Sequence, residues 1–205
     1  MTQVKVCGIC DLEAARAATR AGVDLIGFHF CSSRRRVEPE RARAIVEALE
    51  ARPGVVGVFI DQPEDEVEQV AAYVGLDLVQ LHGSEPVGFR SSRPILKALK
   101  VRGGELPEVE GWPDPILLDS WSPDQRGGTG RAWDWGAARE LLRRRRAFIA
   151  GGLSPENVGQ VIATLRPYGV DVSSGVEREV RIKDPDRIRA FVQAVRHADR
   201  GAGER

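Results

Sequence analysis

The chain has 205 residues, of which 42% are hydrophobic, and this is enough to form the core of one large domain. Its 30 basic and 30 acidic side chains cancel, so the formal net charge is zero. This balance excludes the overall positive field on which binding to nucleic acid or to an anionic membrane depends. We therefore expect no nucleic acid and no membrane as a partner, and an anionic small molecule must be bound by local groups.

Short apolar runs rich in β-branched residues alternate along the chain with amphipathic segments. The runs predict strands at residues 4–9, 25–30, 55–60, 78–82, 95–101, 116–120, 147–151 and 170–173. The amphipathic segments predict helices at residues 12–21, 40–50, 64–74, 133–145, 156–165 and 185–197. Asp11 and Gly22 fit the cap and the stop of the first helix, and Pro39, Pro63 and Pro155 open three later ones.

Two connections and the C-terminus lack this clear pattern. Residues 83–94, after the fourth strand, have weak periodicity, and residues 102–115, after the fifth, are rich in Gly, Pro and Glu. Both connections predict degraded or very short helices. Residues 198–205 have no apolar anchors, which predicts a frayed tail.

Eight strands with helical connections, and no linker-like change in composition across residues 1–205, favour one closed domain over an open doubly wound sheet. The predicted fold class is α/β: a (β/α)8 TIM barrel of eight parallel strands with one or two degraded connecting helices. Barrels of this kind keep their chemistry at the C-terminal ends of the strands. Polar residues at those ends are therefore the candidate site.

Localisation and redox state follow from what the sequence lacks. No segment resembles a signal peptide, and no apolar run approaches the roughly 20 residues that span a bilayer, so we expect a cytoplasmic protein. Three cysteines, an odd number, argue against a disulfide framework and leave reactive or buried thiols as the alternatives.

Cys7 and Asp119 stand at the ends of the first and sixth predicted strands. A thiolate can remove a proton and a carboxyl group can protonate an oxygen, if their environments set the two pKa values apart. Each residue also has a structural explanation. A cysteine in a strand is often a small buried hydrophobic residue, and an aspartate at a strand end is often a helix cap. Position alone leaves both roles open.

Glycine pairs follow the last two strands and indicate a ligand class. Gly151-Gly152 and Ser174-Gly175 lie where many such barrels bind phosphate through backbone N–H groups and the start of a short extra helix. The pairs favour a phosphorylated small-molecule substrate, although glycine also serves tight turns. Arg35 has the planar fork that suits a carboxylate, but it lies in an arginine-rich loop and fits a surface residue equally well.

The motifs in their order resemble the phosphoribosylanthranilate isomerases along roughly residues 4–195. Each motif is modest, and the specificity comes from their order and spacing. They are KVCGI (5–9), GFHF (27–30), SRR (33–35), GVF (57–59), QLHG (80–83), LDS (118–120), GGTG (127–130), AGGL (150–153), PENV (155–158), DVSSGVE (171–177) and KD (183–184).

This resemblance implies an Amadori rearrangement in tryptophan biosynthesis, without cofactor or metal. N-(5-phosphoribosyl)anthranilate becomes 1-(2-carboxyphenylamino)-1-deoxyribulose 5-phosphate. In the family, the aspartate matching Asp119 is the general acid and protonates the ribose ring oxygen. The cysteine matching Cys7 is the general base and takes the proton from the sugar C2. We therefore expect a lowered or matched pKa at Cys7, with Lys5 on the same side of the strand as an electrostatic helper.

The resemblance also implies a set of substrate-binding residues. Arg35 is expected to hold the anthranilate carboxylate, and the backbone around Gly152 and Ser174-Gly175 to hold the phosphate. The whole expected set is Arg35, Gln80, His82, Gly128, Gly151, Gly152, Asp171, Ser173, Ser174 and Gly175. Family members occur as monomers and dimers, so the oligomeric state stays open between a monomer and a homodimer.

Three positions depart from the family pattern. Cys10 stands where threonine is common, the stretch between Phe30 and Ser33 is about two residues short, and Val180-Arg181 replaces the usual Pro-Gly. These departures put the loop of Arg35 and the eighth loop in doubt, and they leave Cys7 and Asp119 in place.

The Cys7-x-x-Cys10 spacing supports two rival interpretations: a thioredoxin-like redox protein, and a zinc site that adds His29 and Cys31. Another barrel acting on a sugar phosphate is the more serious rival. Among these, indoleglycerol-phosphate synthase needs a lysine and a glutamate at strand ends, whereas Lys97 lies within the fifth strand. A non-catalytic binding protein on the same fold is the last alternative.

Overall fold

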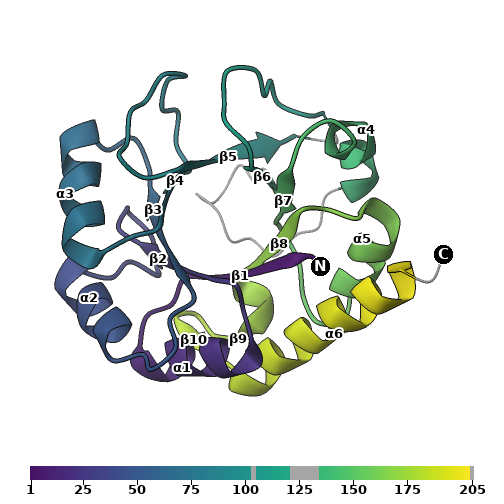
Figure 1. The fold of residues 1–205 in the computed structure, drawn as a ribbon, viewed down its shortest axis with the longest axis horizontal. Helices are drawn as coiled ribbons and strands as arrows, with labels where there is room; N and C mark the ends of the chain where they lie inside the picture. Colours follow the sequence, from purple (N-terminus) through teal and green to yellow (C-terminus); the bar gives the residue numbers. More distant parts are fainter. Residues whose placement is uncertain (103–104, 121–133, 204–205) are drawn as a thin grey trace.

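The computed structural model describes residues 1–102, 105–120 and 134–203, with only the backbone at 202–203. Eight parallel strands form a closed barrel in chain order, which confirms the predicted fold class (Figure 1). The barrel closes where the first strand pairs with the eighth, with Lys5 opposite Asp171. The strands are β1 (Gln3–Cys7), β2 (Leu25–His29), β3 (Gly54–Phe59), β4 (Leu78–Leu81), β5 (Ile95–Val101), β6 (Ile116–Ser120), β7 (Ala147–Ile149) and β8 (Gly169–Val172).

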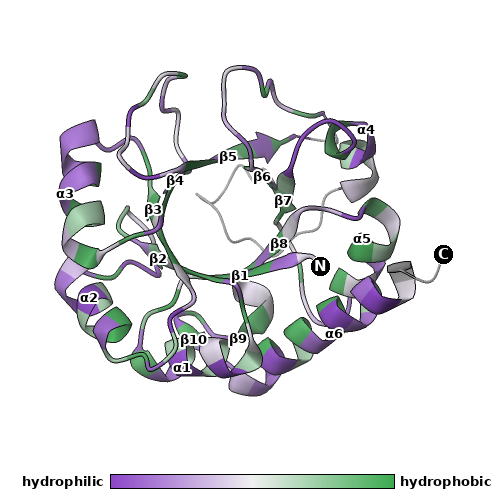
Figure 2. Cartoon of the chain, in the orientation of Figure 1, coloured by the Kyte–Doolittle hydropathy of each residue, from purple (hydrophilic) through white to green (hydrophobic). Residues whose placement is uncertain are grey.

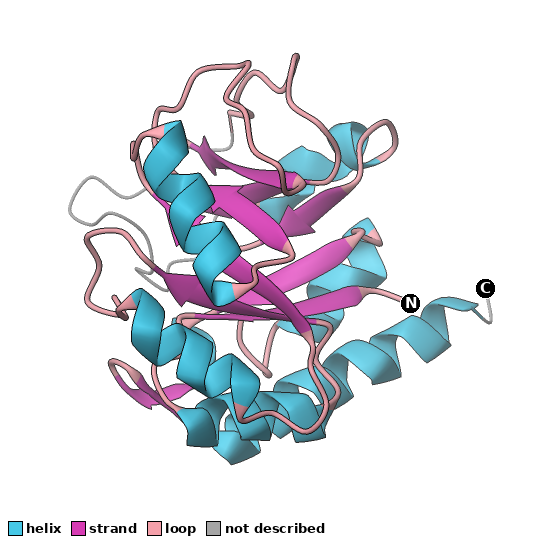
Figure 3. Ribbon diagram, turned by 60° about the vertical axis from the view of Figure 1, so that its left-hand side comes forward, coloured by secondary structure: helices cyan, strands magenta, loops and turns pink. Residues whose placement is uncertain are grey.

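Helices surround the barrel on its outer side, as the two ribbon views show (Figures 1 and 3). They are α1 (Leu12–Ala21), α2 (Pro39–Glu47), α3 (Glu64–Val74), α4 (Arg139–Leu142), α5 (Val158–Leu165) and α6 (Pro185–Gly203), with a 3-10 turn η1 (Trp135–Ala138) before α4. The β4–β5 connection contains no helix, and neither do the described residues 102 and 105–115 of the β5–β6 connection. The two weakly periodic segments are therefore loops in their described residues.

Local signals explain where α1 begins and ends, and a tertiary contact extends α6. Asp11 accepts a hydrogen bond from the backbone N–H of Ala14 (2.8 Å), and Gly22 ends the helix in the left-handed region at φ 79°. Helix α6 continues to Gly203, whereas the sequence predicts its end at residue 197 and a frayed tail from 198. Asp199 accepts hydrogen bonds from the backbone N–H and the hydroxyl of Thr2, which tie this last part of α6 to the N-terminus.

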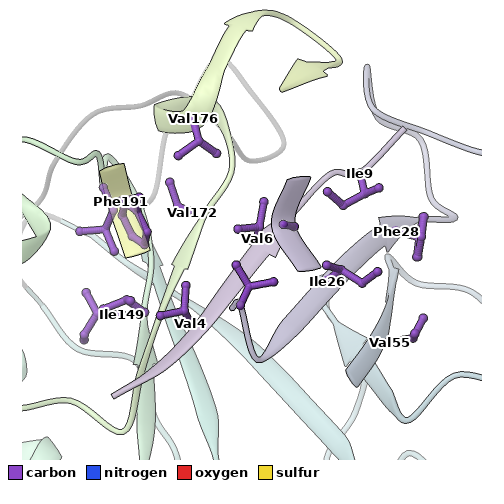
Figure 4. Packing of buried hydrophobic residues seen from close by; sticks show 14 of the residues in the cluster. Val4, Val6, Ile9, Ile26, Phe28, Val55, Ile149, Val172, Val176 and Phe191 are labelled. Atoms are coloured by element: carbon purple, nitrogen blue, oxygen red, sulfur yellow. The ribbon is translucent and has the colours of Figure 1, made fainter. Parts of the chain in front are cut away.

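Successive side chains along each strand point alternately outward and inward, and this divides the core into an outer and an inner part. Val4 and Val6 of β1 pack outward with Phe191 of α6 in the cluster between barrel and helices (Figure 4). The inner cluster consists of Leu96, Ala98, Leu117, Phe148 and Ala150. In Figure 2 the strands are largely hydrophobic, while the helices carry both hydrophobic and hydrophilic residues. Lys5, between the two outward valines, and Cys7, directly after them, belong to the inner side of β1.

A small hairpin follows β8 and was not predicted. The 3-10 turn η2 (Ser174–Val176) leads into β9 (Glu177–Glu179), which pairs antiparallel with β10 (Ile182–Lys183). This hairpin brings Glu177 and Lys183 to the end of the barrel where the strands terminate. Within the described part of the chain, no helix has both the length and the apolar character needed to cross a membrane.

Candidate active site

A pocket opens at the C-terminal ends of the strands, where barrel enzymes carry their chemistry. Its volume, including the part open to solvent, is about 750 Å³. Most of the predicted site residues line it: Cys7, Arg35, Gln80, His82, Asp119, Gly151, Gly152, Asp171, Ser173 and Ser174. Gly175 lies in η2 but does not line the pocket, and Gly128 lies outside the described residues.

The thiol of Cys7 ends β1 and lies against its neighbour in β2. Gly27 is the residue paired with Cys7, and a Cβ at that position would come within 2.8 Å of Cys7 Sγ. The absence of a side chain at Gly27 therefore creates the space that the sulfur occupies. Cys7 Sγ also lies 3.3 Å from Nε2 of His29, two residues further along β2.

We expect Gly27→Ala to displace the sulfur and lower kcat by about tenfold or more. The free energy of unfolding is expected to fall by about 1–3 kcal/mol, because the added methyl group overpacks this part of the site. Gly159→Ala in α5 is the matched control, since nothing lies within 4 Å of its added Cβ. Steady-state kinetics and urea unfolding measure both effects, and unchanged turnover in Gly27→Ala would mean that the position of the sulfur tolerates this shift.

A buried ion pair lies behind Cys7. Lys5 is fully buried, and its Nζ lies 2.9 Å from Asp171 Oδ1. Burial opposes the charge of Lys5, but Asp171 and Cys7 outweigh it and raise the pKa of Lys5. For Cys7, burial has the largest effect and raises the pKa of the thiol, while Lys5 acts to lower it. Lys5 thus acts in the expected direction, but the expectation of a lowered or matched pKa at Cys7 is wrong: burial outweighs the cation, and the pKa of the thiol is raised.

Asp119 reaches the opposite side of the pocket from β6. Its Oδ1 accepts a hydrogen bond from the backbone N–H of Ser120 (2.8 Å), and its Oδ2 lies 3.3 Å from His82 Nε2. His82 Nδ1 in turn lies 3.1 Å from Gln80 Nε2. The contact of His82 Nε2 with Asp119 does not have hydrogen-bond geometry, and among the described residues neither His82 Nε2 nor Gln80 Oε1 has a hydrogen-bond partner. Buried polar atoms are rarely left unpaired, so these two atoms are suited to meet a ligand.

Arg35 is buried, and its guanidinium is already paired. Its Nε and Nη2 donate to the two carboxylate oxygens of Glu177 at 2.7 and 2.6 Å. Lys183 Nζ also lies 3.0 Å from Glu177 Oε1 and donates to the backbone oxygen of Ser173. Glu177 raises the pKa of Arg35. For Glu177 itself, burial acts to raise the pKa, but the bonds from Arg35 and Lys183 outweigh it and lower the pKa.

The lowered pKa of Glu177 predicts a specific dependence of stability on pH. Its contribution is present above the carboxyl pKa of the unfolded chain, about 4.3, and is lost as the pH falls through the lower folded pKa. We expect Glu177→Gln to be less stable by about 2 kcal/mol at neutral pH and equally stable in acid below both pKa values. Urea unfolding of both proteins across this range tests this. A constant difference at all pH values would contradict the assignment.

The loops after β7 and β8 meet at one side of the pocket. Gly151 and Gly152 both have positive φ, at 82° and 71°. Asn157 holds this loop, because its Nδ2 donates to the carbonyl of Gly152 and its Oδ1 accepts from the backbone N–H of Ser154. A side chain at Gly175 would overlap the carbonyl oxygen of Leu153, so the η2 turn packs directly on the β7 loop.

The rival sites from the sequence find little support in this geometry. Cys7, Cys10 and Cys31 are all free, and Cys10 Sγ donates to the backbone oxygens of Gly8 and Arg35 rather than meeting Cys7. In the described ranges, no group of three or more His, Cys, Asp or Glu side chains is arranged to hold a metal ion. Lys97 donates to Gly83 O and Glu85 Oε2 and does not line this pocket.

Comparison with known proteins decides between the remaining sugar-phosphate barrels. The sequence profile of the family described as N-(5'phosphoribosyl)anthranilate (PRA) isomerase matches residues 4–194. This chain belongs to that isomerase family. The resemblance read from the motifs is therefore confirmed over nearly the whole barrel.

Individual members of this isomerase family align along almost their full length. The N-(5'-phosphoribosyl)anthranilate isomerase of Desulforudis audaxviator is 45% identical over 206 residues, covering 97% of this chain and 100% of that protein. The crystal structure of the isomerase from Thermus thermophilus has a TM-score of 0.87 at 39% identity, covering 96% and 99%. A further isomerase structure, in complex with reduced 1-(o-carboxyphenylamino)-1-deoxyribulose 5-phosphate, has a TM-score of 0.82 at 34% identity, covering 96% and 100%.

The roles of three residues in the site were not predicted from the sequence. His29 was considered as a zinc ligand and as part of a motif, and Glu177 and Lys183 only as parts of motifs. The pairing of Arg35 with Glu177 joins residues 142 positions apart, so no local pattern reveals it. The one available signal was that a buried arginine requires a carboxylate, and Glu177 is the first acidic residue after β8.

Proposed function

We propose that this chain converts N-(5'-phosphoribosyl)anthranilate to 1-(2-carboxyphenylamino)-1-deoxyribulose 5-phosphate in tryptophan biosynthesis. Membership of the family supports the proposal, as does the solved relative that binds the reduced form of this aminoketose phosphate. The observation that carries it is the presence of a thiol, Cys7, and a carboxyl group, Asp119, in the walls of one pocket. A base and an acid are the two groups that an Amadori rearrangement requires.

In the proposed reaction, Asp119 protonates the ribose ring oxygen, the bond from C1 to this oxygen breaks, and a protonated Schiff base forms. Cys7 then removes the proton from C2, and the electron pair of that bond forms the C1–C2 double bond of an enolamine. The enolamine becomes the ketone when Cys7 returns its proton to C1 and Asp119 takes the proton of the C2 hydroxyl. Protons and electrons balance on these two residues, so we expect no cofactor and no metal.

The substrate is proposed to lie between a phosphate end and a carboxylate end. Backbone groups of Gly151, Gly152, Ser174 and Gly175 suit the phosphate, because they come from the loops after β7 and β8, where such barrels bind phosphate. Arg35 suits the anthranilate carboxylate. Since Glu177 occupies its Nε and one Nη2 hydrogen, the carboxylate is expected to bind along the Nη1–Nη2 edge.

Expression of the chain in a tryptophan auxotroph that lacks this isomerase tests the proposal. We expect growth without tryptophan, and conversion of the aminoaldose to the aminoketose by the purified protein in the presence of a chelator. A purified, folded protein that neither rescues growth nor converts the substrate would overturn the proposed activity. Stoichiometric zinc bound through Cys7 would overturn the assignment of the thiol as a base.

A further inference from the structure

His29 joins the thiol of Cys7 to a hydroxyl group in a short chain of contacts. Its Nε2 lies 3.3 Å from Cys7 Sγ, and its Nδ1 lies 2.9 Å from Ser33 Oγ. Ser33 Oγ also accepts a hydrogen bond from the backbone N–H of Arg35 (3.1 Å), so its position is held by the loop after β2. Both nitrogens of the imidazole therefore have defined neighbours, and the ring is fixed between Cys7 and Ser33.

Burial shifts the pKa values of Cys7 and His29 in opposite directions. It raises the pKa of the Cys7 thiol, so at neutral pH the sulfur holds its proton and is a poor base. Burial also holds the pKa of His29 well below its ordinary value, and the nearby cation Lys5 adds to this effect. The imidazole is therefore neutral, with one N–H and one nitrogen that can accept a proton. A neutral acceptor lies beside a thiol that must lose its proton in order to act.

The charged groups around the pair come from several elements. Lys5 lies on β1 and is paired with Asp171 on β8. Arg35, in the loop after β2, and Lys183, on β10, both bond to Glu177 on β9. His82, directly after β4, is a further titratable neighbour of His29. Three cations thus face two carboxylates. This surplus of positive charge favours a thiolate at Cys7, and it also opposes the positive charge that His29 gains when it takes the proton.

We propose that His29 is a positioning residue for the base: its Nδ1–H donates to Ser33 Oγ, and its Nε2 accepts the proton of the Cys7 thiol. This inference rests on the proposed role of Cys7. In the step, the S–H bond breaks, its electron pair stays on sulfur, and an N–H bond forms at Nε2. The thiolate then takes the C2 proton of the substrate. The imidazolium returns its proton to sulfur at the end of the cycle, after Cys7 has protonated C1.

Two substitutions separate proton transfer from hydrogen bonding. His29→Leu removes both functions, whereas His29→Gln keeps a hydrogen-bonding group but cannot take up a proton. Both are made in a Cys10→Ala, Cys31→Ala background, so that Cys7 is the only thiol. The measurements are the pH dependence of kcat/KM and the ionisation of Cys7, followed by thiolate absorbance and by the rate of alkylation.

We expect both variants to move the acidic limb of kcat/KM and the ionisation of Cys7 to higher pH by about one unit or more. Activity at neutral pH then falls by about tenfold or more, and it recovers in alkali, where the thiol ionises without help. Ser33→Ala is expected to move the acidic limb of kcat/KM and the ionisation of Cys7 in the same direction by a smaller amount. Recovery in alkali also establishes that the variants fold and bind substrate.

Three results would overturn the inference. The first is a wild-type pH dependence of kcat/KM in His29→Gln, because a hydrogen bond to Cys7, without proton uptake, would then be enough for activity. The second is an unshifted profile in both variants. The third is a loss of activity that persists at every pH, because a purely structural role predicts it. Cys7→Ala in the same background separates the two proposals: if it keeps its activity, the base assignment fails, and if it is inactive while the His29 profiles are unshifted, only the present inference fails.

Discussion

Cys7→Ala is expected to lower kcat by about 10²–10⁴-fold, with a much smaller effect on KM, because a positioned base contributes that much to proton transfer. Asp119→Asn is expected to produce a loss in the same range. Asparagine has nearly the same shape and can still accept the hydrogen bond from the backbone N–H of Ser120, but it has no acidic proton for the ring oxygen. Steady-state kinetics on the aminoaldose and thermal unfolding of each variant measure the loss and establish that the fold persists.

Cys10→Ser is the matched control for Cys7. Cys10 is also a buried thiol at the end of the first βα loop, but its Sγ donates to the backbone oxygens of Gly8 and Arg35, and a hydroxyl can keep such bonds. We expect this variant to retain kcat within about twofold, in line with the small effects of substitutions that preserve contacts. Wild-type turnover in Cys7→Ala or in Asp119→Asn would contradict the assignment of these two residues as base and acid.

Lys5→Met is expected to lower the free energy of unfolding by about 3–5 kcal/mol, because it leaves the carboxylate of Asp171 without its partner inside the barrel. Lys5 is fully buried and Asp171 is nearly so, with side-chain exposures of 0% and 10%. The same variant is expected to raise the pKa of Cys7 further, since Lys5 lowers it in the native protein. Urea unfolding and a thiol titration measure the two effects.

Two comparisons make this result specific. Lys100→Met removes an exposed lysine from β5 and is expected to change stability by no more than about 0.5 kcal/mol. Adding Asp171→Asn to Lys5→Met removes the unpaired charge and is expected to recover part of the lost stability. Equal stabilities of Lys5→Met and the native chain would mean that the ion pair contributes nothing, and an unchanged thiol titration would exclude Lys5 as an electrostatic helper.

The arrangement of strands could be predicted because each strand carries its own signal. Runs such as residues 55–60 and 116–120 are apolar and bounded by turn residues, and the residues of β1 alternate between outward valines and inward Lys5 and Cys7. Once eight such strands close into a barrel, their C-terminal ends must meet. Cys7 and Asp119 therefore share a pocket because of the order of the strands and the inward direction of both side chains. Nothing in the sequence around one of these residues points to the other.

The contacts that tune this pocket could not be predicted in the same way. Arg35 had a plausible partner in a substrate carboxylate, but the folded chain pairs it with Glu177, which the β9–β10 hairpin brings to it. His29 reads as one residue of an apolar strand, and its distance to Cys7 depends on how β1 and β2 pair and on the absence of a side chain at Gly27. Such side-chain distances arise from register and loop conformation, which leave no periodic trace in the sequence.

The sequence by itself thus determined the barrel, the family, and the identity of the thiol and the carboxyl group at its mouth. These depend on local patterning and on motif order, both of which are present in the unfolded chain. Only the tertiary structure decided the electrostatic state of the thiol. Burial raises the pKa of Cys7, against the sequence-based expectation, and the cations that oppose this effect, Lys5 and Lys183, come from β1 and β10, while Asp171 of β8 adds to it. Burial and Coulomb interactions depend on distances in space, and those distances exist only once the barrel has closed.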